Sequence, residues 1–270
     1  MKTYVVKFGG NAIRGKTDLI RLSEEAAELI RSNIGIVLVH GGGPEISDEM
    51  EKRGLVPAKA AGLRVTDRKT LEVAEEVLGS LNREITGSLT ESGVNAIGLP
   101  GYLCTLCRKK GPYTVTDGGK DVTVDLGLVG EVTGVNSDMI YDLLGSGITP
   151  VIYPIGADRE GNHLNVNADT MAAGIAAGIN CEELVTITDV PGIMTDVRDP
   201  SSKLDSVSLE TVDKMIKAGV ISGGMIPKVE ACRNALNSGV KAVRIVSGKD
   251  PRSIMTDAIK GIPHGTVITR

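Results

Sequence analysis

Apolar runs rich in β-branched residues alternate along the chain with stretches of helical period. Residues 34–40, IGIVLVH, are almost continuously apolar, as in a strand that is buried on both faces of a sheet. Residues 17–32 instead carry apolar side chains at helical spacing. This alternation predicts an α/β fold in which helices cover both faces of a mainly parallel sheet. Further strands are predicted at 4–8, 94–99, 148–155, 184–190 and 242–246, and further helices from Pro44 and near 70–91, 136–145, 168–178 and 228–237.

The middle of the chain, residues 100–135, follows a different pattern. It contains YTVTDGGKDVTVDLGLVGEV, which is rich in Thr, Val and Gly and has a turn signal at Asp117-Gly118-Gly119. We expect antiparallel hairpins at an edge of the sheet. No repeat or low-complexity segment is found. A boundary between two lobes is expected near residue 180, although no flexible linker marks it.

Composition narrows the class of protein. The chain has 270 residues, of which 41% are hydrophobic, so it has ample material for a core. A net charge of −4 and only 2% aromatic residues argue against a nucleic-acid binder. No apolar stretch is long enough to span a membrane, and MKTYVVKFGG is not a signal peptide. We therefore expect a cytoplasmic globular protein with neither nucleic-acid nor membrane partners.

Cysteine and histidine give no sign of a metal site. Cys104 and Cys107 form a lone CxxC in GYLCTLCRKK, which resembles a strand, where residues three apart point to opposite faces. No second CxxC or nearby His completes a zinc set, and the three histidines are scattered. We interpret the two cysteines as structural. Whether they ever pair is left open by the sequence.

Two glycine-rich turns follow predicted strands, KFGG at Lys7–Gly10 and HGGG at His40–Gly43. Glycine lets backbone amides approach an anion closely, and Lys7 adds a full positive charge at the first turn. KFGG is equally compatible with a tight strand–helix turn. Three consecutive glycines carry a high conformational entropy cost, which favours an anion site at HGGG. The P-loop pattern occurs nowhere in the chain.

Two polar motifs lie in the predicted N-terminal lobe. GLRVTD contains Arg64, which can hold a carboxylate with two parallel hydrogen bonds, although a surface salt bridge is the simpler interpretation. NVNAD precedes a predicted helix and contains Asn165 and Asp169. Asn165 is a candidate hydrogen-bond partner of a substrate. Asp169 is either an N-cap or a group that orients cations.

Two further motifs lie beyond residue 180. TDVPGI ends an apolar strand and contains Asp189 and Gly192, where ligands bind in open α/β sheets. ISGGMIPK contains a third glycine pair and then Lys228 at the start of a helix. The alternative is an exposed lysine of the first turn, but a cation there opposes the helix dipole, which favours a function in phosphate binding.

Together these motifs resemble the amino acid kinase family. KFGG, VHGGGP, GLRVTD, NVNAD, TDVPGI and SGGMIPKVEA occur in the family's order and approximate spacing, over about residues 3–268. Within the family, the chain is most similar to enzymes that phosphorylate N-acetyl-L-glutamate. The resemblance implies a three-layer αβα sandwich forming one domain, 1–270, with an acid-binding lobe at 1–180 and an ATP lobe at 181–270. The product would be an acyl phosphate.

The resemblance also implies roles for individual residues. Lys7 and Lys228 would stabilise charge on the γ-phosphoryl group, and Asp169 would hold both lysines in position. Gly42 and Gly43 would donate backbone hydrogen bonds to the moving group. The remaining residues would contact the ligands: Arg64 and Asn165 the acid, and Gly9, Gly10, Asp189, Gly192, Ser222 and Gly223 the ATP. Mg²⁺ would arrive with ATP rather than in a protein metal site.

One departure leaves the acceptor open. The acid-phosphorylating group usually carries a Ser-Gly-x-Asp-Gly-like segment where this chain reads LPGYLCTLCRKKG, residues 99–111. The alternatives are a carrier-linked aminoadipate or glutamate, for which 108–110 would form a basic patch, and an alcohol or phosphate such as isopentenyl phosphate. A ligand sensor is the non-enzymatic alternative, but it would not need the charge set of Lys7, Asp169 and Lys228. No long helix precedes the first strand, so we expect a homodimer.

Overall fold

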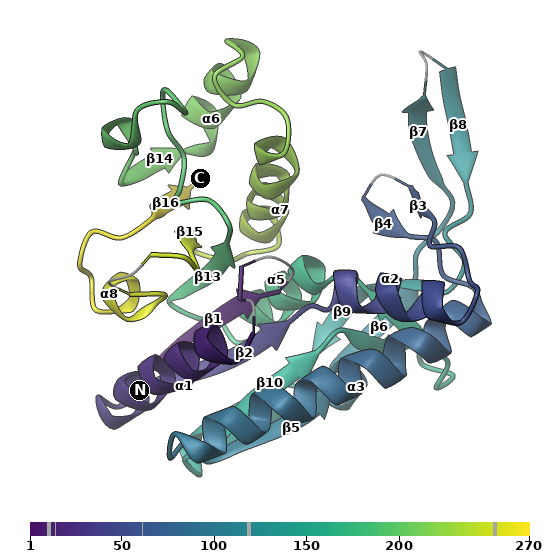
Figure 1. Cartoon of the computed structure of the whole chain (residues 1–270), viewed down its shortest axis with the longest axis horizontal. Helices are drawn as coiled ribbons and strands as arrows, with labels where there is room; N and C mark the ends of the chain where they lie inside the picture. The colour runs from purple at the N-terminus through teal and green to yellow at the C-terminus, as the bar shows by residue number, and fades with distance from the viewer. Residues whose placement is uncertain (10–11, 14, 61, 118–119, 251–252) are drawn as a thin grey trace.

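The centre of the molecule is an eight-stranded sheet with the strand order β14-β16-β15-β13-β1-β2-β10-β5 (Figure 1). The pairs are parallel except for β15–β16. This computed structural model describes all residues except 10–11, 14, 61, 118–119 and 251–252, and for 113–117 and 120–122 it describes the backbone only. The α/β fold with a mainly parallel sheet is thus confirmed.

The strands and helices have the following bounds. The strands of the main sheet are β1 (Lys2–Phe8), β2 (Ile34–His40), β5 (Ala96–Pro100), β10 (Thr149–Tyr153), β13 (Glu183–Thr188), β14 (Ser206–Ser208), β15 (Val243–Ser247) and β16 (Thr266–Thr269). The other strands are β3 (Lys59–Ala60), β4 (Leu63–Arg64), β6 (Thr105–Lys109), β7 (Tyr113–Asp117), β8 (Lys120–Val124), β9 (Val129–Val135), β11 (Ile155–Ala157) and β12 (His163–Val166). The helices are α1 (Gly15–Arg31), α2 (Gly43–Lys52), α3 (Arg68–Glu91), α4 (Ser137–Gly145), α5 (Ala168–Gly178), α6 (Leu209–Lys217), α7 (Met225–Asn237) and α8 (Thr256–Ile259), with short 3₁₀ helices at Gly101–Leu103 and Pro200–Ser202.

Helices cover both faces of the sheet because successive side chains of a strand point to opposite faces. Val6 packs into an apolar cluster with α1, α3 and α8. Its neighbour Val5 packs into a second cluster with α4, α5, α6 and α7. Both valines are fully buried, as expected of a central parallel strand. The result is the three-layer αβα sandwich.

The expected antiparallel pairing is present in the middle segment, but it does not extend the edge of the main sheet, so the expected position was wrong. β6 and β9 join β11 and β12 in a separate four-stranded sheet, and β7–β8 form a hairpin that projects from the body (Figure 1). The separate sheet packs on α5, where Gly174 and Gly178 leave room: a Cβ at either would lie 2.7 and 2.6 Å from side-chain atoms of Val132 and Val135. The turn expected at Gly118-Gly119 lies outside the described residues.

Two further expectations are corrected locally. The run 148–155 is not one strand, because β10 ends before Pro154 and β11 belongs to the second sheet. Proline has no backbone N–H for a sheet ladder, and the chain changes sheets at this residue. The segment before Thr105 is not a strand either, since Gly101–Leu103 is a 3₁₀ helix.

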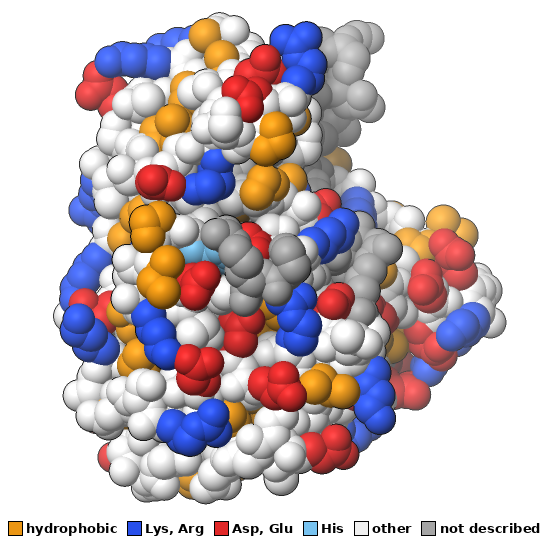
Figure 2. Space-filling model, turned by 60° about the vertical axis from the view of Figure 1, so that its left-hand side comes forward, with side chains coloured by type: hydrophobic (Ala, Val, Ile, Leu, Met, Phe, Trp, Pro, Cys, Tyr) orange, Lys and Arg blue, Asp and Glu red, His pale blue; other side chains and the backbone are white. Residues whose placement is uncertain are grey.

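Charges of both signs are interspersed on the face shown in Figure 2, without a single-sign patch. Over the part of the chain that the structure describes, no helix is long and apolar enough to cross a membrane.

Candidate active site

Two clefts open where β1, β2 and β13 end, and they share Lys7 and Gly9 in their walls. Loops at the carboxyl ends of parallel strands are the usual ligand site of open α/β sheets. The first cleft is lined by Lys7, Gly9, Ala12, Asp169, Ala172, Leu184, Thr186, Ile187, Thr188, Asp189, Pro227, Lys228, Ala231, Cys232, Val243 and Ile245. The second cleft is lined by Lys7, Gly9, Gly41, Gly42, Gly43, Pro44, Ile46, Lys59, Gly62, Leu63, Arg64, Leu78, Val129, Pro154, Asn165, Val166, Asn167 and Ala168.

The two glycine turns touch each other. The Gly41 N–H donates to the Phe8 carbonyl at 2.9 Å. Gly9 has φ +153°, and a Cβ there would lie 2.9 Å from the Gly41 nitrogen, so only glycine fits without a shift. This contact makes the two turns neighbouring parts of one wall. Gly10 lies outside the described residues.

The second glycine turn opens helix α2. Gly42 is its N-cap, and Pro44 occupies the first turn, where a missing N–H does no harm. Gly42 and Gly43 both line the second cleft. Free amides and the positive end of the helix dipole make such a terminus suited to an anion.

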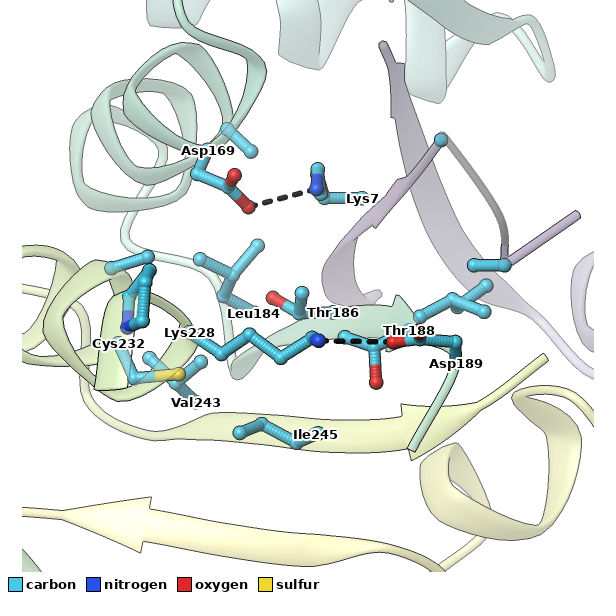
Figure 3. Close-up of a pocket in the computed structure, with 16 residues that line it drawn as sticks. Lys7, Asp169, Leu184, Thr186, Thr188, Asp189, Lys228, Cys232, Val243 and Ile245 are labelled. Atoms are coloured by element: carbon cyan, nitrogen blue, oxygen red, sulfur yellow. Dashed lines mark ion pairs between the residues drawn. The ribbon is translucent and has the colours of Figure 1, made fainter. Parts of the chain in front are cut away.

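Four charged side chains form two ion pairs across the first cleft (Figure 3). Lys7 Nζ lies 2.9 Å from Asp169 Oδ1, and Lys228 Nζ lies 2.9 Å from Asp189 Oδ1. The hydrogen bond from Lys228 lowers the pKa of Asp189. Asp169 was expected to hold both lysines; in this structure it pairs with Lys7, whereas Lys228 is held by Asp189.

Asp169 is free to face Lys7 because another residue caps the helix. The N-cap of α5 is Asn167, whose side-chain oxygen accepts hydrogen bonds from the backbone N–H groups of Asp169 and Thr170. The interpretation of Asp169 as an N-cap is therefore wrong. Its carboxylate lies in the first turn, 35% exposed, on the side of the cleft.

Arg64 lies in the wall of the second cleft and is only 8% exposed. Its Nη2 donates to the Gly43 carbonyl and to Ser47 Oγ, each at 2.8 Å, and burial lowers the pKa of the guanidinium. Among the described residues no carboxylate pairs with it, so the simpler interpretation as a surface salt bridge does not hold. A buried guanidinium without a counter-ion is suited to an anionic ligand.

Asn165 lies in the same wall, on β12. Its Nδ2 donates to Thr66 Oγ1 at 3.0 Å. Because Asn165 and Arg64 line one cleft, the structure brings together the two residues expected to contact the acid.

Three residues that were predicted to contact the nucleotide are not among the described residues that line the first cleft. Gly192 has φ +144°, and a Cβ there would lie 2.4 Å from Thr266 Oγ1, so packing alone accounts for this glycine. Ser222 and Gly223 form the turn that leads into α7, where their carbonyls accept hydrogen bonds from Met225 and Ile226. That turn positions the helix that carries Lys228.

Several cleft residues carry no recognisable signal in the sequence. Leu184, Val243 and Ile245 give the first cleft an apolar wall, but along the chain they are ordinary strand residues. Cys232 also faces this cleft (Figure 3), and burial raises the pKa of its thiol to about 12. Lys59 lines the second cleft from the short strand β3, which has no distinct pattern.

Within the altered segment 99–111, Thr105–Lys109 form strand β6 of the second sheet. Cys104 and Cys107 are buried free thiols, and burial raises the pKa of Cys104 to about 12, which makes a reactive thiolate unfavourable. Arg108, one of the three basic residues, is paired with Glu131 on β9 at 2.5 Å.

The sequence matches the amino acid kinase family over residues 2–247. The chain belongs to the amino acid kinase family. Curated relatives include an acetylglutamate kinase of Methanococcus vannielii, 42% identical over 99% of this chain and 92% of the relative. Another is an acetylglutamate kinase of Methanosphaera stadtmanae, 40% identical over 99% and 91%.

Solved structures agree on the fold of this family member. An N-acetylglutamate synthase from Neisseria gonorrhoeae superimposes with a TM-score of 0.81 at 22% identity, over 100% of this chain and 59% of that one. At this identity the likeness concerns the fold alone.

Proposed function

We propose that this protein is an ATP-dependent kinase that phosphorylates a carboxylate of N-acetyl-L-glutamate and releases an acyl phosphate. The observation that carries the proposal is the meeting of two clefts at Lys7 and Gly9. One cleft has two lysines, and the other has a buried guanidinium that pairs with no carboxylate of the described residues. Relatives more than 40% identical that are known as acetylglutamate kinases support the choice of acceptor.

The first cleft is suited to ATP. Its apolar wall of Leu184, Val243 and Ile245 can accommodate a base, and Lys228 lies in the first turns of α7 for the phosphates. Residues 181–270 would form the ATP lobe, and residues 1–180 the acid lobe. Asp189 would lie along the nucleotide.

The second cleft is suited to a small dicarboxylate. Arg64 would hold the carboxylate that does not react, and Asn165 would hydrogen-bond the acid from the same wall. The reacting carboxylate is ionised at pH 7, so the transfer needs no general base. Alignment and charge stabilisation then carry most of the catalysis.

The shared wall is suited to the transition state. Lys7 lies between the clefts, held by Asp169, and the amides of Gly42 and Gly43 would donate to the moving phosphoryl group. Lys228 has to leave Asp189 to reach that group. Their side chains are 30% and 41% exposed, and an ion pair this exposed contributes at most about 1 kcal/mol, so the exchange is easy.

Mg²⁺ would accompany ATP. It binds nucleotide phosphates, several waters and one or two carboxylates, and it draws charge from the leaving phosphate oxygens. Asp169 and Asp189 are the carboxylates that line the first cleft, so the donor set fits such an ion.

Trapping of acyl phosphate by hydroxylamine tests the proposal. The protein, ATP and Mg²⁺ are incubated with a panel of acids, including N-acetyl-L-glutamate and a carrier-linked aminoadipate. We expect hydroxamate with N-acetyl-L-glutamate at the highest kcat/KM. Formation of hydroxamate only with the carrier-linked acid would show that the acceptor is a carrier-linked acid and not N-acetyl-L-glutamate. Consumption of an alcohol or of isopentenyl phosphate, without formation of hydroxamate, would contradict the proposal that the acceptor is a carboxylate. No turnover with any acceptor would favour a ligand sensor.

We also propose that the enzyme is a cytoplasmic homodimer. β5 is one of the two edge strands of the main sheet, and its Ile97 is 36% exposed, so this edge has apolar surface for a second subunit. Light scattering after size-exclusion chromatography should give twice the chain mass of 28.3 kDa. A single-chain mass at assay concentration contradicts the dimer.

A further inference from the structure

His40 is the one residue of HGGG with a side chain, and that side chain is almost completely buried. It is 1% exposed at the end of β2, between Phe8 and Tyr153, whose ring centroids each lie 6.3 Å away. It does not line either cleft but faces a third cavity behind the glycine turns, with Phe8, Leu81 and Ile85. A direct contact of His40 with substrate is therefore not its role.

The hydrogen bonds around His40 determine which ring nitrogen carries the proton. Asn82 Nδ2 donates to the Val151 carbonyl at 2.9 Å, and a carbonyl can only accept, so this atom of Asn82 is the NH₂ group. The same NH₂ group lies 3.1 Å from His40 Nε2, which must then accept. The proton of the neutral ring is therefore on Nδ1, which lies 2.9 Å from the Gly41 carbonyl and donates to it.

The neutral ring agrees with its surroundings. Burial lowers the pKa of His40 to about 4, so the ring stays uncharged at neutral pH. Asn82 lies on α3, and Val151, whose carbonyl accepts the other hydrogen bond of its NH₂ group, lies on β10. The chain of hydrogen bonds thus connects two rigid elements to one peptide of the glycine turn.

Fixing the Gly41 carbonyl also fixes the next amide. In a trans peptide the C=O of Gly41 and the N–H of Gly42 point in opposite directions. Because the carbonyl points back to His40, the Gly42 N–H points away from it, on the side of the second cleft that Gly42 lines. No described backbone carbonyl accepts this N–H. Glycine by itself would leave this peptide free to rotate.

We propose that His40 is a positioning residue: through the Asn82–His40–Gly41 hydrogen bonds it holds the 41–42 peptide so that the Gly42 N–H faces the transferred phosphoryl group. The inference rests on the proposed function, since it gives Gly42 the role of a donor to the transition state. A fixed donor loses no energy to reorganisation when charge develops, which is the basis of preorganised catalysis. The alternative is a core histidine that only satisfies buried groups.

The test compares His40→Asn with His40→Leu. The two side chains have nearly the same shape. Both lack the ring nitrogen Nε2 that accepts a hydrogen bond from Asn82, but only asparagine keeps a donor near the position of Nδ1. Loss of one oxyanion-type donor lowers kcat by about 10²–10³. We expect His40→Leu to lower kcat about 10²-fold, with both KM values within about 3-fold, and His40→Asn to recover most of that loss.

A purely structural role predicts a different result. The two variants would then lose stability to a similar extent and keep the same kcat per folded molecule, and that outcome overturns the proposal. Circular dichroism and thermal unfolding give the folded fraction of each variant.

The wild-type protein supplies a second measurement in case His40→Leu does not fold. Two-bond ¹H–¹⁵N correlation spectra at pH 7.5 should show His40 protonated at Nδ1 and bare at Nε2. The opposite tautomer overturns the proposal, because Nδ1 could not then donate to Gly41. If the wild-type chain forms no acyl phosphate with any acid, the proposed function fails, and the spectra still decide whether His40 orients the peptide.

Discussion

Lys7 and Lys228 differ in how firmly the structure holds them. Lys7 is 15% exposed and lies on the central strand, next to both glycine turns. Lys228 is 30% exposed and lies on a helix whose preceding turn has the positive-φ residue Gly223. Under the proposed function, Lys228 would benefit from this freedom, because it would have to follow the transferred phosphoryl group. Lys7, which lies between the two clefts, would benefit from being held firmly.

Lys228→Ala should therefore affect catalysis far more than folding. We expect kcat to fall about 10³-fold, because a cation is lost where charge develops. The melting temperature should change little, since partly exposed ion pairs contribute at most about 1 kcal/mol. Steady-state kinetics and thermal unfolding measure both effects. Lys217→Ala, at the exposed end of α6, is the control. Full activity of Lys228→Ala would remove Lys228 from the mechanism.

Arg64→Lys should weaken binding of the acid. Lysine cannot reproduce the two hydrogen bonds of Arg64 Nη2 and still offer a planar pair of donors to a carboxylate. A charged hydrogen bond contributes about 1.5–3 kcal/mol, so KM for the acid should rise about 10- to 100-fold while KM for ATP stays the same. Arg68→Lys is the control, because Arg68 is an exposed residue of α3. An unchanged KM for the acid contradicts the assignment.

The buried His40 should make stability depend on pH. Its pKa is about 4 when folded, below the ordinary value of 6.5, so the unfolded chain takes up a proton first as the pH falls. The stabilisation is complete above pH 6.5 and is lost as the pH falls through 4, by about 3 kcal/mol for a shift of this size. Urea unfolding between pH 7.5 and 4 should show this loss, and His40→Asn should lack it. An equal pH dependence of both proteins would contradict the low pKa.

At the scale of elements, three helices begin at the clefts. Gly43 of α2 and Ala168 of α5 line the second cleft, and Pro227 and Lys228 of α7 line the first. Helix N-termini carry partial positive charge and unsatisfied N–H groups. These helix N-termini thus provide a positive electrostatic potential that attracts phosphates and carboxylates, in addition to the charge of the lysines.

A carboxylate of α1 also ties the C-terminal segment to the N-terminal lobe. Glu25 accepts hydrogen bonds from the backbone N–H groups of Ile254, Met255 and Thr256, at 2.7–2.8 Å. These groups lie at the start of α8, which contacts α1.

Glu25→Ala should therefore destabilise the protein by about 2 kcal/mol, because buried amide donors lose their acceptor. The free energy of unfolding in urea measures it. Glu24→Ala, one residue earlier and exposed, should have almost no effect. Equal stability of the two variants would show that the hydrogen bonds of Glu25 do not stabilise the start of α8.

At the scale of the whole molecule, the two clefts share Lys7 and Gly9 but otherwise have separate linings. The first cleft takes residues from both sides of position 180, such as Asp169 and Asp189, whereas the second takes all of its described lining from residues up to 168. This distribution supports an ATP site between the lobes and an acid site within the N-terminal one.

Hydrogen exchange can test this division. A non-hydrolysable ATP analogue should slow exchange in 184–189 and 227–232, and N-acetyl-L-glutamate should slow it in 41–44 and 63–65, since these segments line different clefts. Both ligands should protect residues near Lys7. Protection of 227–232 by the acid alone would reverse the assignment of the clefts.

Local patterns in the sequence predicted the main elements well. The strand 34–40 and the helix 168–178 have the predicted bounds in the structure. In the first case a continuous apolar run requires burial on both faces, and in the second a polar Asn167 can cap the helix. The separate second sheet was missed, because β9 pairs with β12, and these two strands are separated in the chain by α4, β10 and β11.

The sequence by itself determined the fold class, the two glycine turns and the residue types of a phosphoryl-transfer site. The fold class and the turns follow from periodicity and from the conformational freedom of glycine, which act over a few residues. The assignment of the residue types to phosphoryl transfer follows from the resemblance of their motifs to those of the amino acid kinase family. Only the tertiary structure decided the partners: Asp189 rather than Asp169 for Lys228, Gly43 and Ser47 for Arg64, and Asn82 for His40. Such pairs depend on which strands and helices pack together, and packing is a property of the whole chain.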